Sequence, residues 1–500
     1  MRKTVKKLTA VGLTVTSVLG LVACGSSKGT TSQGTSENKE VTKPDTFTVM
    51  CDGTVVTETN GAEAFYKQLN EATGLDIKWT RPDHASYYDA VANAFNSDDT
   101  MPDVVLLSSD YYALYASNGF LWNMTDAWEH SETKNSGRLI STADNVLSAL
   151  MVNGEDGTKA MYGLSLYRGN GCCTYVKKAW LDKAGIDVSK VKDVQMDFNT
   201  YYGYLKQMAQ TMGHYVISSP GFIHPEAPNT NYLPEFYQKA QYTFYKDTSG
   251  KYVDGFAQQE MKEALQRIQT AVNDGVIDKE SVNNSTANAR DKFYSTDPST
   301  ETGVFTYWAG TWANTLKTNL ANKGLDDELI AIKPIKELGA YTERIAPCWC
   351  ITSAAKNPEG IFKYFIDKML DGGDVQMLWT HGAKGTHWDD KAETVTVEKK
   401  EDQPKTYTEG QFHYLPGIEK PDQWQTKNHI DPILSIANFT NGYVGESLIP
   451  EVARENGEFF AENSQVAVPL PMTSELSNNI GDINTARTYV IAQVALGYMT

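Results

Sequence analysis

Strand and helix patterns alternate at the start of the folded region, and this alternation limits the fold more than any other feature. Segments 46–50 and 75–79 alternate apolar and polar residues as strands do, and a helical stripe of apolar residues fills 62–73 between them. A second stripe, over 88–95, leads into the run 104–107, which is apolar on both faces like a buried parallel strand. This order predicts βαβ units and an α/β fold.

Further strands and helices follow along the rest of the chain. Residues 221–256 are rich in Pro, Asn and Tyr and predict irregular structure, whereas the polar stretch 389–410 predicts a surface hairpin. The folded region of roughly 455 residues is too long for one hydrophobic core, so we expect two or three domains. The predicted strands lie at 164–166, 172–176, 215–217 and 304–308, and the predicted helices at 178–184, 200–212, 258–274, 316–323, 361–370 and 485–498.

The N-terminus carries the features of a secretory signal peptide. Four Lys and Arg residues occur among the first seven positions, and an apolar stretch, shorter than the roughly 20 residues that cross a membrane, runs from Leu8 to Ala23. The stretch ends in Leu-Val-Ala-Cys, which resembles a bacterial lipobox and predicts lipidation of Cys24. We therefore expect a signal peptide over 1–23, then a lipidated Cys24 and flexible tether over 24–44. Acyl chains such as palmitate would anchor the protein outside the cell membrane.

The mature chain is strongly acidic. The full sequence has a formal net charge of −17, and residues 1–23 hold four positive and no negative charges, so their removal brings the charge to −21. Such a surface repels nucleic acid and anionic lipid, and it argues mildly against a polyanionic ligand unless a local basic cleft overrides it. No second apolar run approaches the length of a membrane span, so we expect membrane attachment through the lipid anchor alone.

The cysteines and the sequence motifs give little sign of chemistry. Besides Cys24 the chain has five cysteines, at 51, 172, 173, 348 and 350. We expect them to be small core residues and predict no disulfide framework. No second Cys/His pair lies near Cys348-Trp349-Cys350, so no metal site is predicted there. No nucleophile-elbow, zinc-protease, P-loop or dinucleotide-binding motif occurs, so we predict no catalytic residue, no cofactor and no enzyme activity.

Four short segments, in their order and spacing, carry a family resemblance that covers residues 46–500. They are Met101–Val105, the stretch from Tyr162 to Gly185, the helix start at Asn357-Pro358-Glu359, and Gly382–Trp388. On these residues the chain resembles the family 1 extracellular solute-binding proteins, in the large lipoprotein branch that serves ABC-type importers of complex sugars.

The resemblance implies a two-lobed α/β fold of the periplasmic-binding-protein type II, with a mixed sheet flanked by helices in each lobe and several hinge crossings. We predict a discontinuous first lobe, 45–165 and 305–370, and a second lobe, 166–304 and 371–500. Some relatives hold calcium in the second lobe, but the stretch 187–199 lacks the D-x-[DN]-x-[DN]-G pattern, so no calcium site is predicted.

Aromatic side chains at the ends of strands are the leading candidates for ligand binding. A pyranose ring presents C–H patches that pack on aromatic faces, while its hydroxyls need hydrogen-bonding partners. Tyr307, Trp308 and Trp312 lie where a predicted strand ends, the position that open α/β sheets favour for ligands, whereas Trp128 and Trp180 are expected in the core. The other candidates are Trp349 on a returning strand, Asp110 and Tyr111 after the strand 104–107, Arg168 and Asn170 in a Gly-flanked loop, Trp388, and Asp52.

Together these features predict an extracytoplasmic substrate-binding lipoprotein of an ABC transporter. Lobe closure would bury an oligosaccharide between aromatic platforms, and the closed, monomeric protein would then dock on the transmembrane permease subunits. Two alternatives stay open at this point. One is a peptide-binding receptor of the same transporter class, and the other is a surface glycan hydrolase, which needs two facing carboxylates about 5–10 Å apart.

Overall fold

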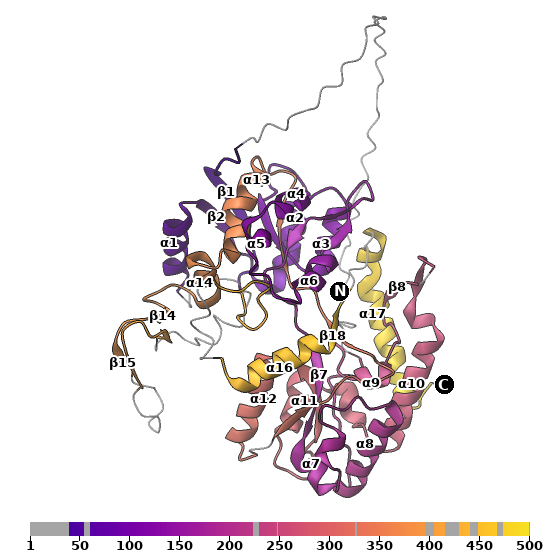
Figure 1. The fold of residues 1–500 in the computed structure, drawn as a ribbon. Helices are drawn as coiled ribbons and strands as arrows, with labels where there is room; N and C mark the ends of the chain where they lie inside the picture. The colour runs from indigo at the N-terminus through magenta and orange to yellow at the C-terminus, as the bar shows by residue number, and fades with distance from the viewer. Residues whose placement is uncertain are drawn as a thin grey trace, which may run out of the picture. The chain divides into compact units, whose positions relative to one another are not determined.

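The computed structural model describes residues 40–54, 61–223, 230–247, 249–325, 328–395, 405–415, 430–440, 449–467 and 474–499 (Figure 1). The predicted signal peptide, Cys24 and the tether up to residue 39 lie outside the described residues, so the predictions about them stay predictions. Residues Val41–Thr500 form one compact unit. Among the described helices, none is long and apolar enough to cross a membrane.

Five strands form the first sheet: β1 (Thr46–Met50), β2 (Asp76–Thr80), β3 (Val104–Leu107), β6 (Gly163–Leu164) and β13 (Cys348–Ile351). Their order is β2-β1-β3-β13-β6, with β1 parallel to β2 and β3 and with β13 antiparallel to β3 and β6. β1 alternates exposed residues with the buried Phe47 and Val49, whereas all four residues of β3 are buried. The sequence predictions for β1 and β3 are confirmed residue for residue.

Helices from both halves of the chain pack into the core of this sheet. The first helix ends as its sequence predicts, because Gly74 adopts a left-handed conformation (φ 59°) and donates its N–H to Asn70 O at 2.6 Å. The helix predicted over 361–370 is found as a short α-helix, a π-helical turn (Phe362–Ile366) and a 3-10 turn (Asp367–Leu370). The helices are α1 (Ala62–Thr73), α2 (Tyr87–Ala94), α3 (Ser109–Ser117), α4 (Thr125–Glu129), α5 (Glu132–Asn135), α6 (Ala143–Ala149), α13 (Pro358–Ile361) and α14 (Asp374–His381), and a small hairpin joins β4 (Met151–Asn153) to β5 (Lys159–Met161).

A second, smaller sheet has its own core. Its strands are β7 (Cys172–Lys177), β10 (Val304–Trp308) and β11 (Leu329–Ala331), in the order β10-β7-β11 and antiparallel to β7 on both sides. The strand predicted over 215–217 is reduced to single parallel bridges, one of them from Ile217 to Val304, which makes the sheet mixed as predicted. Trp180 is fully buried in this core, and Trp128 is 3% exposed in the core of the first sheet.

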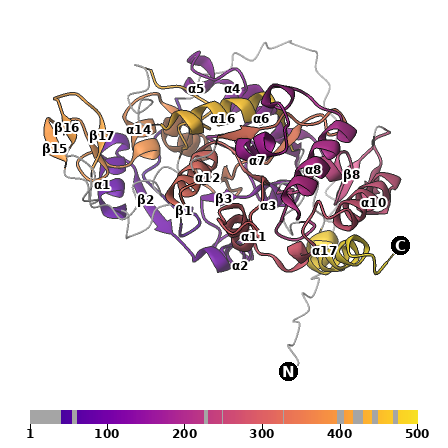
Figure 2. The same cartoon turned by 90° about the horizontal axis from the view of Figure 1, so that it is seen from below.

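Helices also surround the second sheet, and α10 and α17 lie side by side (Figures 1 and 2). The stretch predicted to be irregular contains a short hairpin, β8 (Phe244–Lys246) and β9 (Tyr252–Asp254). The helices are α7 (Lys178–Lys183), α8 (Phe198–Met212), α9 (Pro234–Tyr237), α10 (Gln259–Asn273), α11 (Thr286–Phe293), α12 (Thr311–Asn322), α16 (Glu451–Glu462) and α17 (Ser474–Ala495).

The division of the chain between the two sheets differs from the predicted lobe boundaries. The sequence places 305–370 in the first lobe, but β10 and β11 pair with β7, so these two strands belong to the second sheet. The sequence places 371–500 in the second lobe, but α14 packs on α1 of the first sheet. The residues from β13 to α14, together with Ile430, Ile436 and Ala437, therefore pack with the first sheet. β12 (Tyr341–Glu343) pairs with β18 (Ser464–Val466).

The cysteines behave as the sequence predicts. Cys51, Cys172, Cys173, Cys348 and Cys350 are all buried and none forms a disulfide. Burial raises the pKa of the Cys51 thiol to about 12. Such thiols stay protonated and unreactive at neutral pH.

Candidate functional site

Aromatic side chains gather where β10 ends and α12 begins. Trp308 is the last residue of β10, Gly310 makes the turn with φ 65°, and Trp312 lies in the first turn of α12. Asn456 of α16 holds this turn, because its Oδ1 accepts the N–H of Gly310 at 2.7 Å. Trp312 is 40% exposed and meets the Tyr307 ring edge-on, with 5.6 Å between centroids. The end of β10 thus presents an exposed indole next to a turn that is fixed by a hydrogen bond.

An arginine lies over each of two neighbouring rings at the end of β10. The guanidinium carbon of Arg344 is 4.7 Å from the Trp308 centroid, and that of Arg290 is 5.8 Å from the Tyr307 centroid. Arg290 also donates from Nη1 to the Tyr307 hydroxyl at 2.8 Å. Burial raises the pKa of Tyr307 despite the opposing charge of Arg290, so this hydroxyl stays protonated at neutral pH. We call Tyr307, Trp308, Trp312, Arg290 and Arg344 the β10 group.

Asn170 braces the β10 group from the residues before β7. It adopts a left-handed conformation (φ 59°), donates from Nδ2 to Ala309 O at 3.1 Å, and accepts the Gly171 N–H on Oδ1 at 2.8 Å. Both polar atoms of the side chain are therefore already hydrogen-bonded within the protein. Its predicted hydrogen bond to a ligand stays a prediction.

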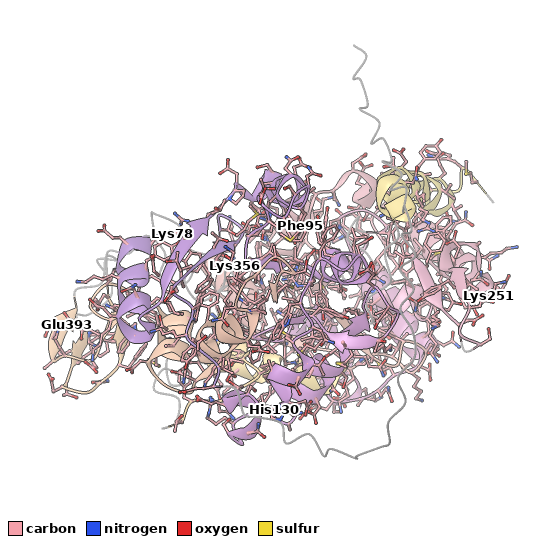
Figure 3. The ribbon with its side chains drawn as sticks, turned by 90° about the horizontal axis from the view of Figure 1, so that it is seen from above. Lys78, Phe95, His130, Lys251, Lys356 and Glu393 are labelled. Atoms are coloured by element: carbon pink, nitrogen blue, oxygen red, sulfur yellow. The ribbon has the colours of Figure 1, made fainter. Side chains whose placement is uncertain are left out.

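A second aromatic group lies beside the carboxyl ends of the parallel strands in the first sheet. Tyr88 of α2 and Tyr111 of α3 stack face to face, with 3.8 Å between centroids and 6° between planes. Ser108, directly after β3, donates its backbone N–H to the Tyr88 hydroxyl at 2.8 Å. Burial raises the pKa of Tyr88 to about 12. The row of rings continues through Tyr115 to Phe95, which is labelled in Figure 3.

Asp52 lies at the same edge of the first sheet, after β1. Its carboxylate accepts the backbone N–H and the hydroxyl of Thr54 at 2.9 and 2.8 Å, and it lies 2.5 Å from Nδ1 of His84. The His84 side chain is 76% exposed. We call Asp52, His84, Tyr88 and Tyr111 the β3 group, which combines a stacked pair of rings with an exposed imidazole.

The structure places Trp349 in the core of the first sheet. It is 2% exposed on β13, and its ring meets Phe365 and Trp379 edge-on, with centroid distances of 5.9 and 5.6 Å. The physical reason is the position of β13, which has β3 on one side and β6 on the other. Trp349 is therefore a packing residue in this structure, not a ligand contact as predicted.

Arg168 is also buried rather than presented to a ligand. It is 6% exposed and forms a two-pronged ion pair with Glu343, which is 1% exposed; Nε lies 3.0 Å from Oε1, and Nη2 contacts Oε2. The pair joins two segments that cross between the sheets. Its guanidinium therefore binds Glu343 at the point where the chain crosses between the sheets.

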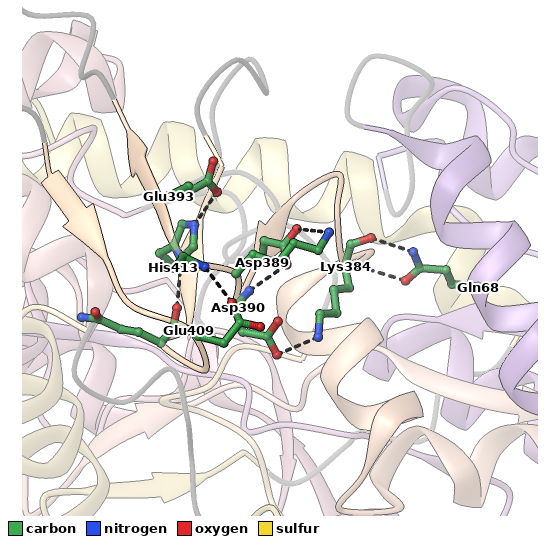
Figure 4. A network of polar contacts seen from close by, with 10 residues as sticks. Gln68, Lys384, Asp389, Asp390, Glu393, Glu409 and His413 are labelled. Carbon is green, nitrogen blue, oxygen red and sulfur yellow. Dashed lines mark hydrogen bonds and ion pairs between the residues drawn. The ribbon is translucent and has the colours of Figure 1, made fainter.

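Trp388 belongs to a separate polar region formed by β14 (Trp388–Asp389), β17 (His413–Tyr414) and the predicted hairpin, β15 (Glu393–Val395) with β16 (Lys405–Tyr407). Its Nε1 donates to Gly382 O at 2.9 Å, and its ring stacks on Phe412. Figure 4 shows the surrounding network, in which Lys384 pairs with Asp390 at 2.6 Å and His413 contacts Glu393 at 2.6 Å. Trp388 thus supports a turn, and the side chain of the remaining candidate, Asp110, lies outside the described residues.

Two surface hollows in the described ranges share no residue with either aromatic group. One, of about 420 Å³, lies between α1 and β2 and includes Tyr66 and Trp79. The other, of about 440 Å³, lies beside β18 and includes Asp193, Lys333 and Glu462. The described residues hold no cluster of three or more His, Cys, Asp or Glu that could bind a metal. The side chains of the two aromatic groups offer stacking, hydrogen bonding and charge attraction.

Sequence reasoning missed Tyr88, His84, Arg290 and Arg344. Tyr88 had a readable signal, because Tyr87 and Val91 of the same helix face the core and leave Tyr88 on the neighbouring face. The sequence contained no signal for the two arginines, because each contacts its ring from a different segment of the chain. Their role depends on strand pairing that the sequence does not display.

Comparison with known proteins identifies the fold. No protein-family model matches the sequence, and no curated protein matches it. Three similar solved structures are an N-glycan transport solute binding protein from Streptococcus pneumoniae (TM-score 0.56, 16% identity, 91% of this chain and 92% of that chain), an extracellular solute-binding protein from Bifidobacterium longum subsp. infantis (0.58, 13%, 91% and 92%) and a family 1 extracellular solute-binding protein from Alicyclobacillus acidocaldarius (0.56, 14%, 92% and 95%). The two-lobed α/β prediction is confirmed: this chain has the fold of the two-domain extracellular solute-binding proteins.

Proposed function

We propose that this protein is the substrate-binding component of an ABC importer and that it captures an oligosaccharide outside the cell. The observation that carries the proposal is the pair of aromatic groups, each at a strand end of a different sheet in a solute-binding fold. Ligands in open α/β sheets bind outside strand ends, and sugars bind on aromatic faces. The names of several structural neighbours also refer to glycans: N-glycan transport, human-milk-oligosaccharide binding and alginate binding.

The proposed mechanism is capture by closure of the two lobes. The β10 group and the β3 group would contact opposite sides of the glycan, with Trp312 and the Tyr88–Tyr111 pair as the platforms. His84 and Arg344 would supply hydrogen bonds to hydroxyls, each worth about 1 kcal/mol when buried. The segments that carry Arg168 and Glu343 would act as the hinge, since they join the sheets.

The location follows from the N-terminus in this proposal. Cleavage before Cys24 and acylation would tether a monomer to the outer face of the cell membrane, next to the permease subunits that receive the sugar. Cys24→Ala tests the anchor. The variant should appear in the culture medium, whereas the unaltered protein should sediment with membranes; equal partition of the two would contradict lipidation.

A melting screen tests the ligand class. The full chain, purified in detergent, is heated with neutral and acidic oligosaccharides, monosaccharides and short peptides. A ligand at 100 times its Kd stabilises the folded state by about 2.7 kcal/mol, which raises the melting temperature measurably. A shift with one glycan series and no release of reducing ends supports the proposal. Shifts with peptides alone would favour a peptide receptor, and released sugar would indicate a hydrolase.

A further inference from the structure

Arg344 adds to the β10 group a positive charge that forms no ion pair within the described residues. The whole chain has a net charge of −17, yet Arg344 is exposed beside Trp308. Within the described residues its side chain makes one hydrogen bond, from Nε to Gly169 O at 2.9 Å. The N–H groups on its two terminal nitrogens therefore remain available to an acceptor from outside the protein.

Arg290 carries another positive charge beside Tyr307, which precedes Trp308 on β10 and therefore turns to the opposite face of the strand. It is half-buried on α11 and uses Nη1 for the Tyr307 hydroxyl. Neither Arg290 nor Arg344 forms an ion pair with any carboxylate in the described ranges. By contrast, Arg168, Arg454 and Arg487 each pair with an acidic side chain. The cationic character of the β10 group is therefore not cancelled by direct pairing.

A half-buried acid, Asp431, lies near the same tyrosine as Arg344. Asp431 and Arg344 both act electrostatically on Tyr167. The Asp431 carboxylate accepts the backbone N–H of Ile433 at 2.8 Å, and burial raises its pKa to about 6. It forms no ion pair with Arg344 among the described contacts. Its own loop holds Asp431, so it leaves the arginine free to bind an anion.

We propose that the glycan carries a carboxylate and that Arg344 recognises it beside the Trp308 ring. This inference rests on the proposed function. A planar guanidinium matches a carboxylate with two parallel N–H bonds, a geometry that a neutral hydroxyl does not offer. Long-range repulsion from the acidic protein disfavours a polyanion, so the assignment is to a glycan with isolated carboxylates.

The test is calorimetric titration of the full chain with matched glycans. The probes are 3′-sialyllactose, its methyl ester, lactose and lactose 3′-sulfate, and a glucuronate-bearing xylo-oligosaccharide with its methyl ester and its neutral counterpart. At least one acid should bind, with its methyl ester about 10-fold weaker or more, as expected for loss of a charge-assisted bond. Arg344→Gln should weaken binding of the acid by a similar factor and leave binding of the ester unchanged, and Arg344→Lys should restore part of the loss.

Lys251→Gln is the matched control, because it removes one positive charge from an exposed position on the β8–β9 hairpin (Figure 3). It should leave every affinity unchanged, and the melting temperature of each unliganded variant reports its folding. Equal affinity for acid, ester and neutral glycan would overturn this inference and leave the proposed function standing. Equal affinity for the sulfate and the carboxylate would overturn the carboxylate assignment. Failure to bind any glycan, neutral or acidic, would contradict both proposals.

Discussion

Arg168→Met should lower the free energy of unfolding by about 3–5 kcal/mol, because it strands a buried carboxylate. Glu343 is 1% exposed and loses both contacts with the guanidinium, which leaves it the Ser464 hydroxyl at 3.2 Å. The Met side chain fills similar space and cannot donate. The cost should therefore come from the unpaired charge rather than from a cavity.

The double variant Arg168→Met/Glu343→Leu separates the charge from the packing. An apolar pair of similar volume needs no desolvation of ions, so the double variant should recover most of the lost stability. Urea denaturation followed by circular dichroism measures each free energy, and an unchanged slope against urea would show that the unfolded state is not altered. A double variant as unstable as the single one would refute the argument, since packing would then explain the loss.

The same variants decide whether Arg168 contacts ligand. In the proposed arrangement its donors are occupied by Glu343, so a folded Arg168→Met protein should keep its glycan affinity within about 3-fold at a temperature well below its melting point. A normal melting curve combined with a large loss of affinity would contradict the structural role. It would restore the original prediction that this residue faces the ligand.

Three further predictions address other sites. Burial raises the pKa of Glu235 to about 7, so between pH 4.5 and 7 the folded chain holds a proton that the unfolded chain has released. The free energy of unfolding should therefore fall by about 3 kcal/mol as pH rises through this window. Urea titrations at pH 5 and pH 8 measure this difference, and the Glu235→Gln variant should reduce it. Trp349→Ala should cost about 3–5 kcal/mol of stability, and a cost below about 1 kcal/mol would contradict its core position. Trp312→Ala should weaken glycan binding about 10-fold with an unchanged melting temperature, while the similarly exposed control Tyr252→Ala should leave affinity unaltered.

Local patterns predicted the elements well where one face of an element is buried. The helix α1 has its predicted bounds because Phe65 and Leu69 recur at helical spacing and Gly74 ends the helix. β3 is confirmed because every residue of a central parallel strand meets a neighbour. Such signals are contained within a dozen residues, so a single sequence displays them.

Strand pairing could not be predicted from such local patterns. For that reason the predicted lobe boundaries differ from the observed division between the sheets. The register that joins Trp308 to Cys172 links residues more than a hundred positions apart, and nothing local distinguishes β10 as a partner of β7 from a partner of β3. The tryptophans show the consequence. Trp308 ends a strand at the edge of a three-stranded sheet, whereas Trp349 lies on an interior strand of a five-stranded one. Both stand in short strand-like segments, yet one is partly exposed and the other is core.

The crossing segments show how pairing also decides the role of a charge. Arg168 stands in a Gly-flanked loop, which made it a binding candidate, while Arg344 had no distinguishing neighbour. Glu343 and Arg344 are adjacent, so an extended backbone turns them to opposite sides. Glu343 faces inward and captures Arg168, and Arg344 faces outward to Trp308. One ion pair thus fixes the segments of the proposed hinge, and the same geometry turns the second arginine toward the proposed ligand.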